Sequence, residues 1–206
     1  MLKEGDKAPS FDLASDEGGK VSLRDFAGKA LVLFFYPRDN TPGCTREAQA
    51  FTAARKAIEK AGGAVVGVSR DSLKSHQSFR EKCKLGVTLL SDPDLTVHKA
   101  YGAWGEKTMY GKKVEGVLRS TFIVKDGKIA KVFPSVKVDG HADAVLSAVG
   151  ALSGAPPAKS KGAASAGKTA AAAVKRGAKK VAKVAMVAKR AARAAPKERA
   201  KAGTKK

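Results

Sequence analysis

One cysteine follows a turn-forming stretch that contains two prolines and a glycine, Tyr-Pro-Arg-Asp-Asn-Thr-Pro-Gly-Cys at residues 36–44. A buried-strand pattern precedes the stretch and apolar residues with helical spacing follow it, which predicts that Cys44 lies at a helix N-terminus. There, unpaired backbone N–H groups and the positive end of the helix dipole stabilise an anion. We therefore expect Cys44 to hold a large fraction of thiolate, the nucleophilic form of the side chain.

Two further residues could assist a displacement reaction at this sulfur. A thiolate that attacks a peroxide takes one oxygen, and the other oxygen leaves with negative charge, so donors are needed around both oxygens. Thr41, one turn before Cys44, could donate its hydroxyl to the peroxide. Arg119, at the start of a predicted strand, is the candidate cation that holds the thiolate and polarises the O–O bond. The competing interpretation of Cys44 is an inert buried cysteine, which would need neither Thr41 nor the prolines.

The same stretch resembles the active site of the peroxiredoxins. Pro37, Thr41 and Cys44 match the family's spacing of proline, three residues, threonine, two residues and cysteine. The flanking residues are similar to those of the Q-type subgroup, also called bacterioferritin comigratory proteins. The resemblance extends over most of residues 1–150, through matching segments at 5–9, 67–71, 90–94, 101–104 and 119–122.

The resemblance implies a thiol-dependent peroxidase. Such an enzyme reduces hydrogen peroxide and organic hydroperoxides to water and alcohols through a sulfenic acid on Cys44, with Pro37, Thr41 and Arg119 completing the site. Electrons are expected from a thioredoxin-like protein or another thiol reductant. The resemblance implies neither a metal nor a flavin, and it favours a monomer.

The fate of the oxidised cysteine is left open by the sequence. Many members of the subgroup carry a resolving cysteine five residues after the first, where this chain has Gln49. Others carry it on the next helix, about where Arg80 stands, and Cys83 lies one turn later on the same helical face. A disulfide needs Cα atoms about 4.4–6.8 Å apart, so bridging Cys44 to Cys83 would require the Cys44 helix to unwind locally. The alternative to this disulfide is a one-cysteine enzyme that an external thiol reduces. In that case Cys83 is a packing residue.

Four other polar residues near these segments receive simpler interpretations. Glu47 could hold Arg119 in place, but its position in the first turns of the helix favours interaction with the positive helix terminus. His76, His98 and His141 occur singly on predicted helices or helix starts, without the spacing of metal ligands. We therefore expect surface or capping histidines and no metal site.

Alternating strand and helix patterns predict the scaffold around these residues. Strands are expected at 29–36, 64–69, 88–91, 118–124 and 129–132, with small edge strands between 6 and 23, and helices at 44–61, 72–84, 94–101 and 139–148. Ser72 should be the N-cap of the second helix, and Asp126-Gly127 should close a hairpin between the last two strands. The order predicts an α/β fold, a thioredoxin-like three-layer sandwich with a mixed central sheet.

The composition changes abruptly near residue 153. Residues 153–206 hold sixteen of the 40 Lys and Arg residues and one acid, Glu198, which gives +15 of the chain's formal +21 and leaves +6 for residues 1–152. They contain no aromatic residue to anchor a core and are rich in Ala, Lys, Gly and Ser. We predict a peroxiredoxin domain over 1–152 and a disordered, low-complexity basic tail over 153–206.

The tail's charge predicts a polyanionic partner. Its composition resembles the terminal domains of linker histones, and it would bind DNA or RNA phosphates without reading sequence. The cations expected to do so are Lys175, Arg176, Lys179, Lys180, Lys183, Lys189, Arg190 and Arg193. In the alternative hypothesis for the whole chain, nucleic-acid binding is the main function and the first domain is a redox sensor or scavenger near DNA. A solvated extension without a partner is the simpler interpretation, and the tail has too few large apolar residues for firm membrane anchoring.

The two cysteines and the hydropathy pattern bear on location. The chain shows no secretory leader pattern, and no apolar run approaches the roughly 18 residues of a membrane-spanning helix. Two cysteines in such a chain favour a reducing compartment. We therefore expect a cytoplasmic protein without a membrane partner.

Overall fold

The computed structural model describes residues 2–109 and 112–153. Its main sheet has seven strands in the order β2-β1-β5-β4-β3-β8-β9. β3, β4 and β5 run parallel, and the other neighbouring pairs are antiparallel, so the predicted mixed sheet is confirmed. The strands are β1 (Asp12–Ser15), β2 (Lys20–Ser22), β3 (Ala30–Phe35), β4 (Gly63–Ser69), β5 (Thr88–Ser91), β8 (Ser120–Lys125) and β9 (Lys128–Phe133).

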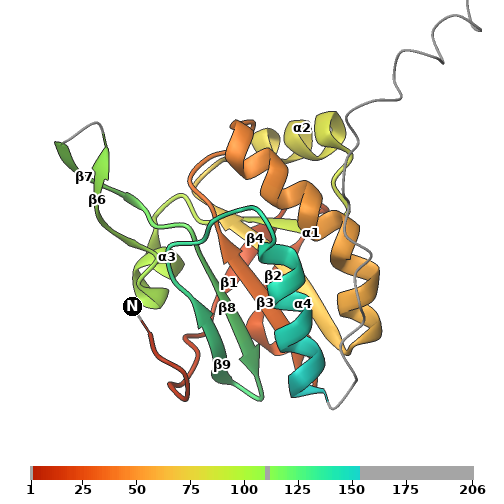
Figure 1. Cartoon of the computed structure of the whole chain (residues 1–206). Coiled ribbons are helices and arrows are strands. Elements are labelled where there is room, and N and C mark those ends of the chain that lie inside the picture. Colours follow the sequence, from red (N-terminus) through yellow and green to blue (C-terminus); the bar gives the residue numbers. More distant parts are fainter. Residues whose placement is uncertain (1, 110–111, 154–206) are drawn as a thin grey trace, which may run out of the picture. The chain divides into compact units, whose positions relative to one another are not determined.

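Helices cover both faces of this sheet, which confirms the predicted three layers. They are α1 (Pro42–Lys60), α2 (Leu73–Cys83), α3 (Thr96–Tyr101) and α4 (His141–Leu152), with a short 3-10 helix η1 at Leu23–Phe26. α1 and α4 lie side by side on one face (Figure 1), and α2 contributes Phe79 to the same apolar cluster. α3 and the N-terminal segment pack on the opposite face.

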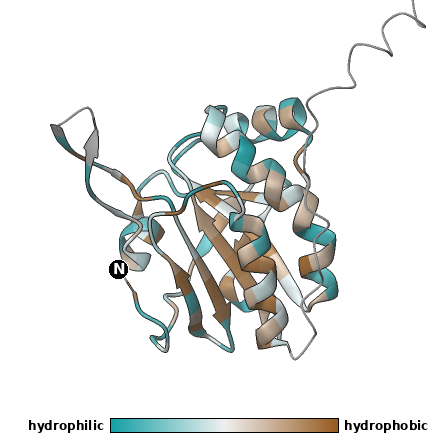
Figure 2. Cartoon of the chain, viewed as in Figure 1, coloured by the Kyte–Doolittle hydropathy of each residue, from teal (hydrophilic) through white to brown (hydrophobic). Residues whose placement is uncertain are grey.

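β3 shows why the sheet is buried from both sides. All six of its side chains are buried. Val32 and Phe34 point toward α1 and α4, whereas Leu33 and Phe35 point toward α3, as expected from the two-residue period of a strand. Figure 2 shows the apolar colour concentrated on these central strands. Each such side chain contributes about 1.5–3 kcal/mol on burial, so the strand that leads to the cysteine loop is a rigid support.

The ends of two helices follow from local capping. α2 begins after Ser72, the predicted N-cap, whose hydroxyl oxygen accepts a hydrogen bond from the Ser75 N–H at 3.3 Å. α3 begins two residues later than predicted, because Leu95 takes a left-handed conformation with φ 58°. The carboxylate of Asp92 then accepts hydrogen bonds from the N–H groups of residues 96, 97 and 98.

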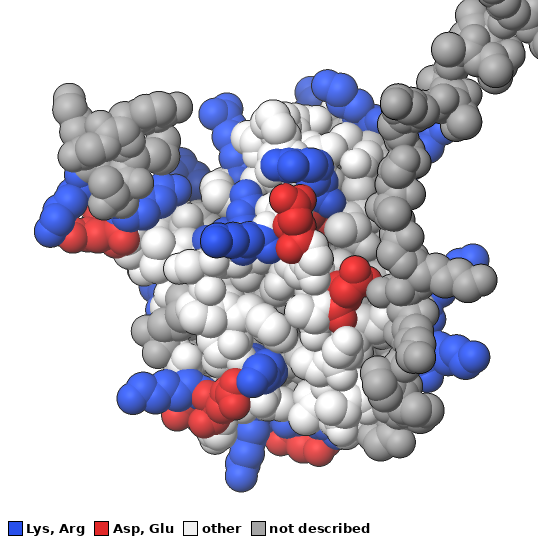
Figure 3. All heavy atoms as spheres, viewed as in Figure 1, with Lys and Arg blue, Asp and Glu red and all other residues white. Residues whose placement is uncertain are grey.

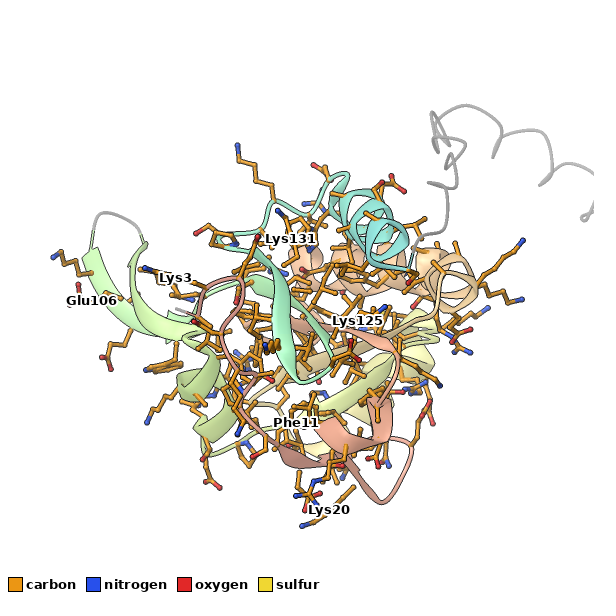
Figure 4. All side chains as sticks on the ribbon, turned by 90° about the horizontal axis from the view of Figure 1, so that it is seen from below. Lys3, Phe11, Lys20, Glu106, Lys125 and Lys131 are labelled. Atoms are coloured by element: carbon orange, nitrogen blue, oxygen red, sulfur yellow. The ribbon has the colours of Figure 1, made fainter. Side chains whose placement is uncertain are left out.

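A second, two-stranded sheet was not predicted. β6 (Trp104–Met109) and β7 (Lys112–Val117) pair in an antiparallel hairpin that projects from the main sheet (Figure 1). Glu106 lies on this hairpin, apart from the sheet, in Figure 4. Few large apolar residues occupy these strands, so the period-2 signal of a half-buried strand is weak. β7 leads directly to Arg119.

The C-terminal predictions fall mostly outside the described residues. α4 ends at Leu152, and the domain boundary after residue 152 stays a prediction. Residues 154–206, with all eight cations expected to bind nucleic acid, are not among those that the structure describes. Across 2–109 and 112–153, none of the helices has the length and apolar character needed to cross a membrane.

Candidate active site

Cys44 lies in the first turn of α1, as predicted. The helix begins at Pro42, whose missing N–H is not needed in a first turn, and Thr41 precedes it in extended conformation with φ −88° and ψ 149°. Cys44 is a free cysteine, and its side chain is only 2% exposed. The orphan N–H groups of the helix N-terminus therefore lie beside a nearly buried sulfur.

Sheet topology brings Arg119 to this sulfur. Arg119 directly precedes β8, and the first residue of β8, Ser120, pairs with Phe35 at the end of β3. The start of β8 therefore lies beside the loop that carries Cys44. The Arg119 Nη2 donates a hydrogen bond to the Cys44 Sγ at 3.2 Å, across 75 residues of sequence. The predicted pairing of a cation with the cysteine is present.

The expectation for Glu47 is wrong. Its side chain is 1% exposed and its Oε2 accepts a hydrogen bond from the Arg119 Nη1, so the carboxyl group faces Arg119 rather than the helix terminus. The reason is helical spacing. Glu47 lies three residues after Cys44 on α1, so both side chains lie on the same face of the helix, which Arg119 contacts. The other carboxyl oxygen, Oε1, has no hydrogen-bond partner among the described residues.

Burial and charge set the electrostatics of this trio. Burial raises the pKa of Glu47 to about 7, against the opposing effect of Arg119. Burial alone would lower the pKa of Arg119, but the neighbouring Glu47 and Cys44 raise it above its ordinary value. Arg119 therefore stays cationic between two groups that carry or acquire negative charge.

Thr41 and Pro37 flank the cysteine loop. The Thr41 hydroxyl donates to the carbonyl oxygen of Arg38 at 3.1 Å instead of capping α1. Its proton would have to turn away from that carbonyl to reach a bound substrate. Pro37 lies two residues after the end of β3. It lines a hollow of about 490 Å³ together with Arg38, Arg70, Asp71 and Ser72.

A buried carboxylate that was not predicted, that of Asp39, anchors the same loop. The Asp39 Oδ1 accepts from the Tyr36 hydroxyl at 2.8 Å, and its Oδ2 accepts from the Ser75 hydroxyl at 2.7 Å and contacts the His76 Nδ1 at 2.8 Å. Burial would raise the pKa of Asp39, but His76 and Ser75 lower it below its ordinary value. His76 is fully buried, so its expected surface position is wrong. The network ties the cysteine loop to α2.

The other two histidines are buried as well, contrary to expectation. His98 lies on α3, and its Nδ1 contacts the Oδ2 of Asp92, which precedes the helix, at 2.7 Å. The His141 Nε2 lies 2.8 Å from the Thr121 hydroxyl oxygen, and burial, with Arg119 nearby, lowers its pKa to about 4. Among the described residues, no group of three or more His, Cys, Asp or Glu side chains could hold a metal ion.

Cys83 lies apart from this constellation, as the last residue of α2. It is a free, partly exposed cysteine that packs against the apolar cluster to which Cys44 belongs. A larger hollow of about 620 Å³ is lined by residues such as Lys7, Phe26 and Leu31. It contains none of the reactive groups, so we place the site at Cys44, where they converge.

A cysteine in the first turn of a helix, faced by an arginine from a neighbouring strand of a three-layer α/β fold, is the arrangement of the peroxiredoxin class. Comparison with known proteins agrees. The AhpC/TSA family model matches residues 4–132. A putative peroxiredoxin Bcp of Coxiella burnetii is 49% identical over 146 residues, 70% of this chain and 97% of the relative. Peroxiredoxin Bcp of Escherichia coli K12 is 42% identical over 70% of this chain and 94% of its own length.

Solved structures give the same result. The bacterioferritin comigratory protein of Xanthomonas campestris, described for its alkyl peroxide reduction activity, superposes with a TM-score of 0.66 at 44% identity, over 69% of this chain and 92% of that one. The chain belongs to the AhpC/TSA family and, within it, to the Bcp or Q-type peroxiredoxins, which are peroxidases with a thioredoxin-like fold.

Proposed function

We propose that the chain reduces hydrogen peroxide and organic hydroperoxides through a sulfenic acid on Cys44. The observation that carries the proposal is the contact of 3.2 Å between the Arg119 Nη2 and the Cys44 Sγ in the first turn of α1. The thiolate attacks one peroxide oxygen, an S–O bond forms and the O–O bond breaks. The other oxygen leaves with the electron pair, takes a proton and departs as water or an alcohol. The alkyl peroxide activity of the Xanthomonas relative supports organic substrates.

Each neighbour of Cys44 receives a role in this step. Arg119 stabilises the thiolate and the charge that develops on the peroxide oxygens. The Thr41 hydroxyl turns from the Arg38 carbonyl to donate to the bound peroxide, and Pro37 fixes the loop after β3. Glu47 holds the guanidinium of Arg119 by accepting from its Nη1.

We propose that Cys83 resolves the sulfenic acid and that a thioredoxin-like protein reduces the resulting disulfide. The Cys83 thiol attacks the Cys44 sulfur, a disulfide forms, and the sulfenic oxygen leaves as water. Thioredoxin-like dithiols then take the two oxidising equivalents by thiol–disulfide exchange. Direct attack of an external thiol on the Cys44 sulfenic acid is the alternative.

Turnover with defined reductants tests these steps. The full chain is supplied with hydrogen peroxide or cumene hydroperoxide, and with thioredoxin, thioredoxin reductase and NADPH. Wild type should consume NADPH with both peroxides, and Cys44→Ser should abolish consumption. Cys83→Ser should lose thioredoxin-dependent turnover but keep one round of peroxide reduction. Full activity of Cys44→Ser would refute the peroxidase assignment, and full activity of Cys83→Ser would establish the external-thiol route.

We further propose that residues 153–206 bind DNA or RNA. The support is their charge of +15 against +6 for residues 1–152. On the face of the folded domain in Figure 3, Lys and Arg side chains lie scattered rather than gathered in one patch. A full-length variant with Gln at the eight tail cations is the test. Wild type and Cys44→Ser should bind duplex DNA with a steep loss of affinity as salt rises. The Gln variant keeps eight of the sixteen tail cations, so it should bind more weakly and with a shallower salt dependence. Equal binding by all three proteins would refute the proposal.

We also propose a cytoplasmic monomer. The support is the pair of free cysteines and the resemblance to the Q-type subgroup. Sedimentation equilibrium of the reduced protein should give the mass of one chain. A dimer mass at micromolar concentration would refute the monomer, and recovery from a periplasmic or secreted fraction would refute the compartment.

A further inference from the structure

Arg80, three residues before Cys83 on α2, hydrogen-bonds to the backbone of residues that follow Cys83. Its Nη1 donates to the Leu85 carbonyl at 3.2 Å and its Nη2 donates to the Val87 carbonyl at 2.7 Å. The Arg80 carbonyl in turn accepts from the Leu85 N–H at 3.0 Å. Cys83 lies between Arg80 and the two carbonyl groups that Arg80 holds. One side chain therefore closes the end of α2 around this cysteine.

Two acidic residues of the β1–β2 turn, Asp16 and Glu17, also hold the guanidinium of Arg80. Asp16 has a fully buried carboxylate that accepts from the Arg80 Nε and, at 3.1 Å, from its Nη2. The Asp16 Oδ1 also accepts from the Leu89 N–H of β5 at 3.0 Å, so the carboxylate is itself held by the sheet. Glu17, half exposed, adds a contact of 3.0 Å to Nη1.

The burial of this cluster makes it strong. The Arg80 side chain is 21% exposed and that of Asp16 is 0% exposed, so water screens their attraction less than it screens a surface ion pair. Burial alone would lower the pKa of Arg80, but Asp16 and Glu17 raise it. Separating Arg80 from Asp16 would leave a buried carboxylate without its cation, so the end of α2 opens only at a substantial cost.

That opening is what disulfide formation requires. Cys44 is buried in the first turn of α1 and Cys83 occupies the last turn of α2, and both cysteines are free in this structure. Joining them needs Cα atoms about 4.4–6.8 Å apart. We infer that the last turn of α2 opens, together with the Cys44 turn of α1, to bring the two cysteines within this distance. Until it does, the Cys44 sulfenic acid stays exposed to a second hydroperoxide, which adds another oxygen and gives sulfinic acid.

We propose that the Arg80 clamp, defined as Arg80 with Asp16, Glu17 and the Leu85 and Val87 carbonyls, positions Cys83 and sets how oxidised Cys44 divides between disulfide and sulfinic acid. The inference rests on the proposed peroxidase function and on Cys83 as the resolving cysteine. In the productive branch, the sulfenic acid and the Cys83 thiol condense to a disulfide and release one water. In the other branch, the hydroperoxide is reduced as the sulfenic acid becomes sulfinic acid.

Two substitutions weaken the clamp to different degrees. Arg80→Lys keeps a positive charge near Asp16, but a single ammonium group cannot reach both acids and both carbonyls. Glu17→Gln removes only the half-exposed ion pair between Arg80 and Glu17. This mild variant preserves the buried pair of Arg80 with Asp16. Lys82→Ala is the matched control, because Lys82 is an exposed cation next to Cys83 outside the clamp.

The experiment mixes reduced full-length protein with hydrogen peroxide, quenches by alkylation and follows each cysteine by mass spectrometry. Arg80→Lys should form the Cys44–Cys83 disulfide about tenfold faster, the factor expected from losing one charged hydrogen bond. It should also need about tenfold more peroxide for half conversion to sulfinic acid. Glu17→Gln should change both in the same direction but less, and Lys82→Ala should match wild type.

The rate of Cys44 thiol loss separates this proposal from the peroxidase proposal. It should be equal in all four proteins, because the clamp acts after the first oxidation. Unchanged or slower disulfide formation in both clamp variants, or no disulfide in any protein, would overturn the clamp while the peroxidase assignment stands. If the Cys44 thiol is not oxidised at all, the peroxidase proposal fails and the clamp proposal fails with it.

Discussion

The buried carboxyl group of Glu47 should make the protein less stable as pH rises through neutrality. Its pKa is raised from 4.5 to about 7 in the folded protein. Between these values the folded state keeps a proton that the unfolded state has lost. The contribution of Glu47 to the free energy of unfolding is therefore greatest below pH 4.5. It falls by about 3 kcal/mol in total as pH rises to about 7.

His141 acts in the opposite direction over an overlapping range. Burial lowers its pKa from 6.5 to about 4, so between these values the unfolded state holds a proton that the folded state lacks. Its contribution to stability increases from about pH 4 to 6.5, by about 2 kcal/mol after an allowance for solvent screening. The two effects largely cancel between pH 4.5 and 6.5.

Urea unfolding of wild type, Glu47→Gln and His141→Gln from pH 4.5 to 8 separates the two contributions. The stability of Glu47→Gln relative to wild type should increase by about 3 kcal/mol across this range, because the amide never ionises. The stability of His141→Gln relative to wild type should decrease by about 2 kcal/mol between pH 4.5 and 6.5. If the Glu47→Gln difference is independent of pH, the carboxyl group is ionised throughout and the reasoning fails.

Two further predictions concern the loop around Cys44. Arg119→Met should lower kcat/KM for hydrogen peroxide by about 10²–10³, as expected for loss of one charged donor to the reacting atoms. The control Arg46→Met removes an exposed cation from α1, the helix that carries Cys44, and should leave stopped-flow rates near wild type. Equal losses in both variants would contradict the role of Arg119. Asp39→Asn should destabilise the fold at pH 7 by about 2 kcal/mol in urea unfolding. Because the pKa of Asp39 is lowered, its contribution is present above the ordinary Asp range and is lost as pH falls through the folded value, so wild type and variant should converge in acid.

Local patterns predicted the part of the site that depends on local structure. The buried run that became β3, and the Pro/Gly-rich loop after it, indicated that Cys44 begins a helix. Ser72 was recognisable as an N-cap because capping involves neighbours in sequence. The antiparallel hairpin of β8 and β9 followed from Asp126-Gly127, which supplies the positive φ angles of its turn.

Contacts between distant residues could not be predicted in the same way. His76 and Asp39 are separated by 37 residues, and only the packing of α2 on the loop after β3 makes them a buried pair. Glu47 resembled any acid near a helix start until sheet topology brought Arg119 beside it. The ion pair of Arg80 with Asp16 was not predicted, because the sequence does not show that the β1–β2 turn lies against α2. These contacts depend on tertiary structure rather than on local propensity.

The most direct test of the account is one equivalent of hydrogen peroxide added to the reduced protein, with each cysteine then read by intact mass and peptide mapping. We predict rapid peroxide loss and oxidation that begins at Cys44, ending in a disulfide with Cys83. In Cys83→Ser, Cys44 should stop at sulfenic or more oxidised forms. If peroxide persists and Cys44 remains a thiol, Cys44 is not the peroxide-reducing residue and the account is contradicted.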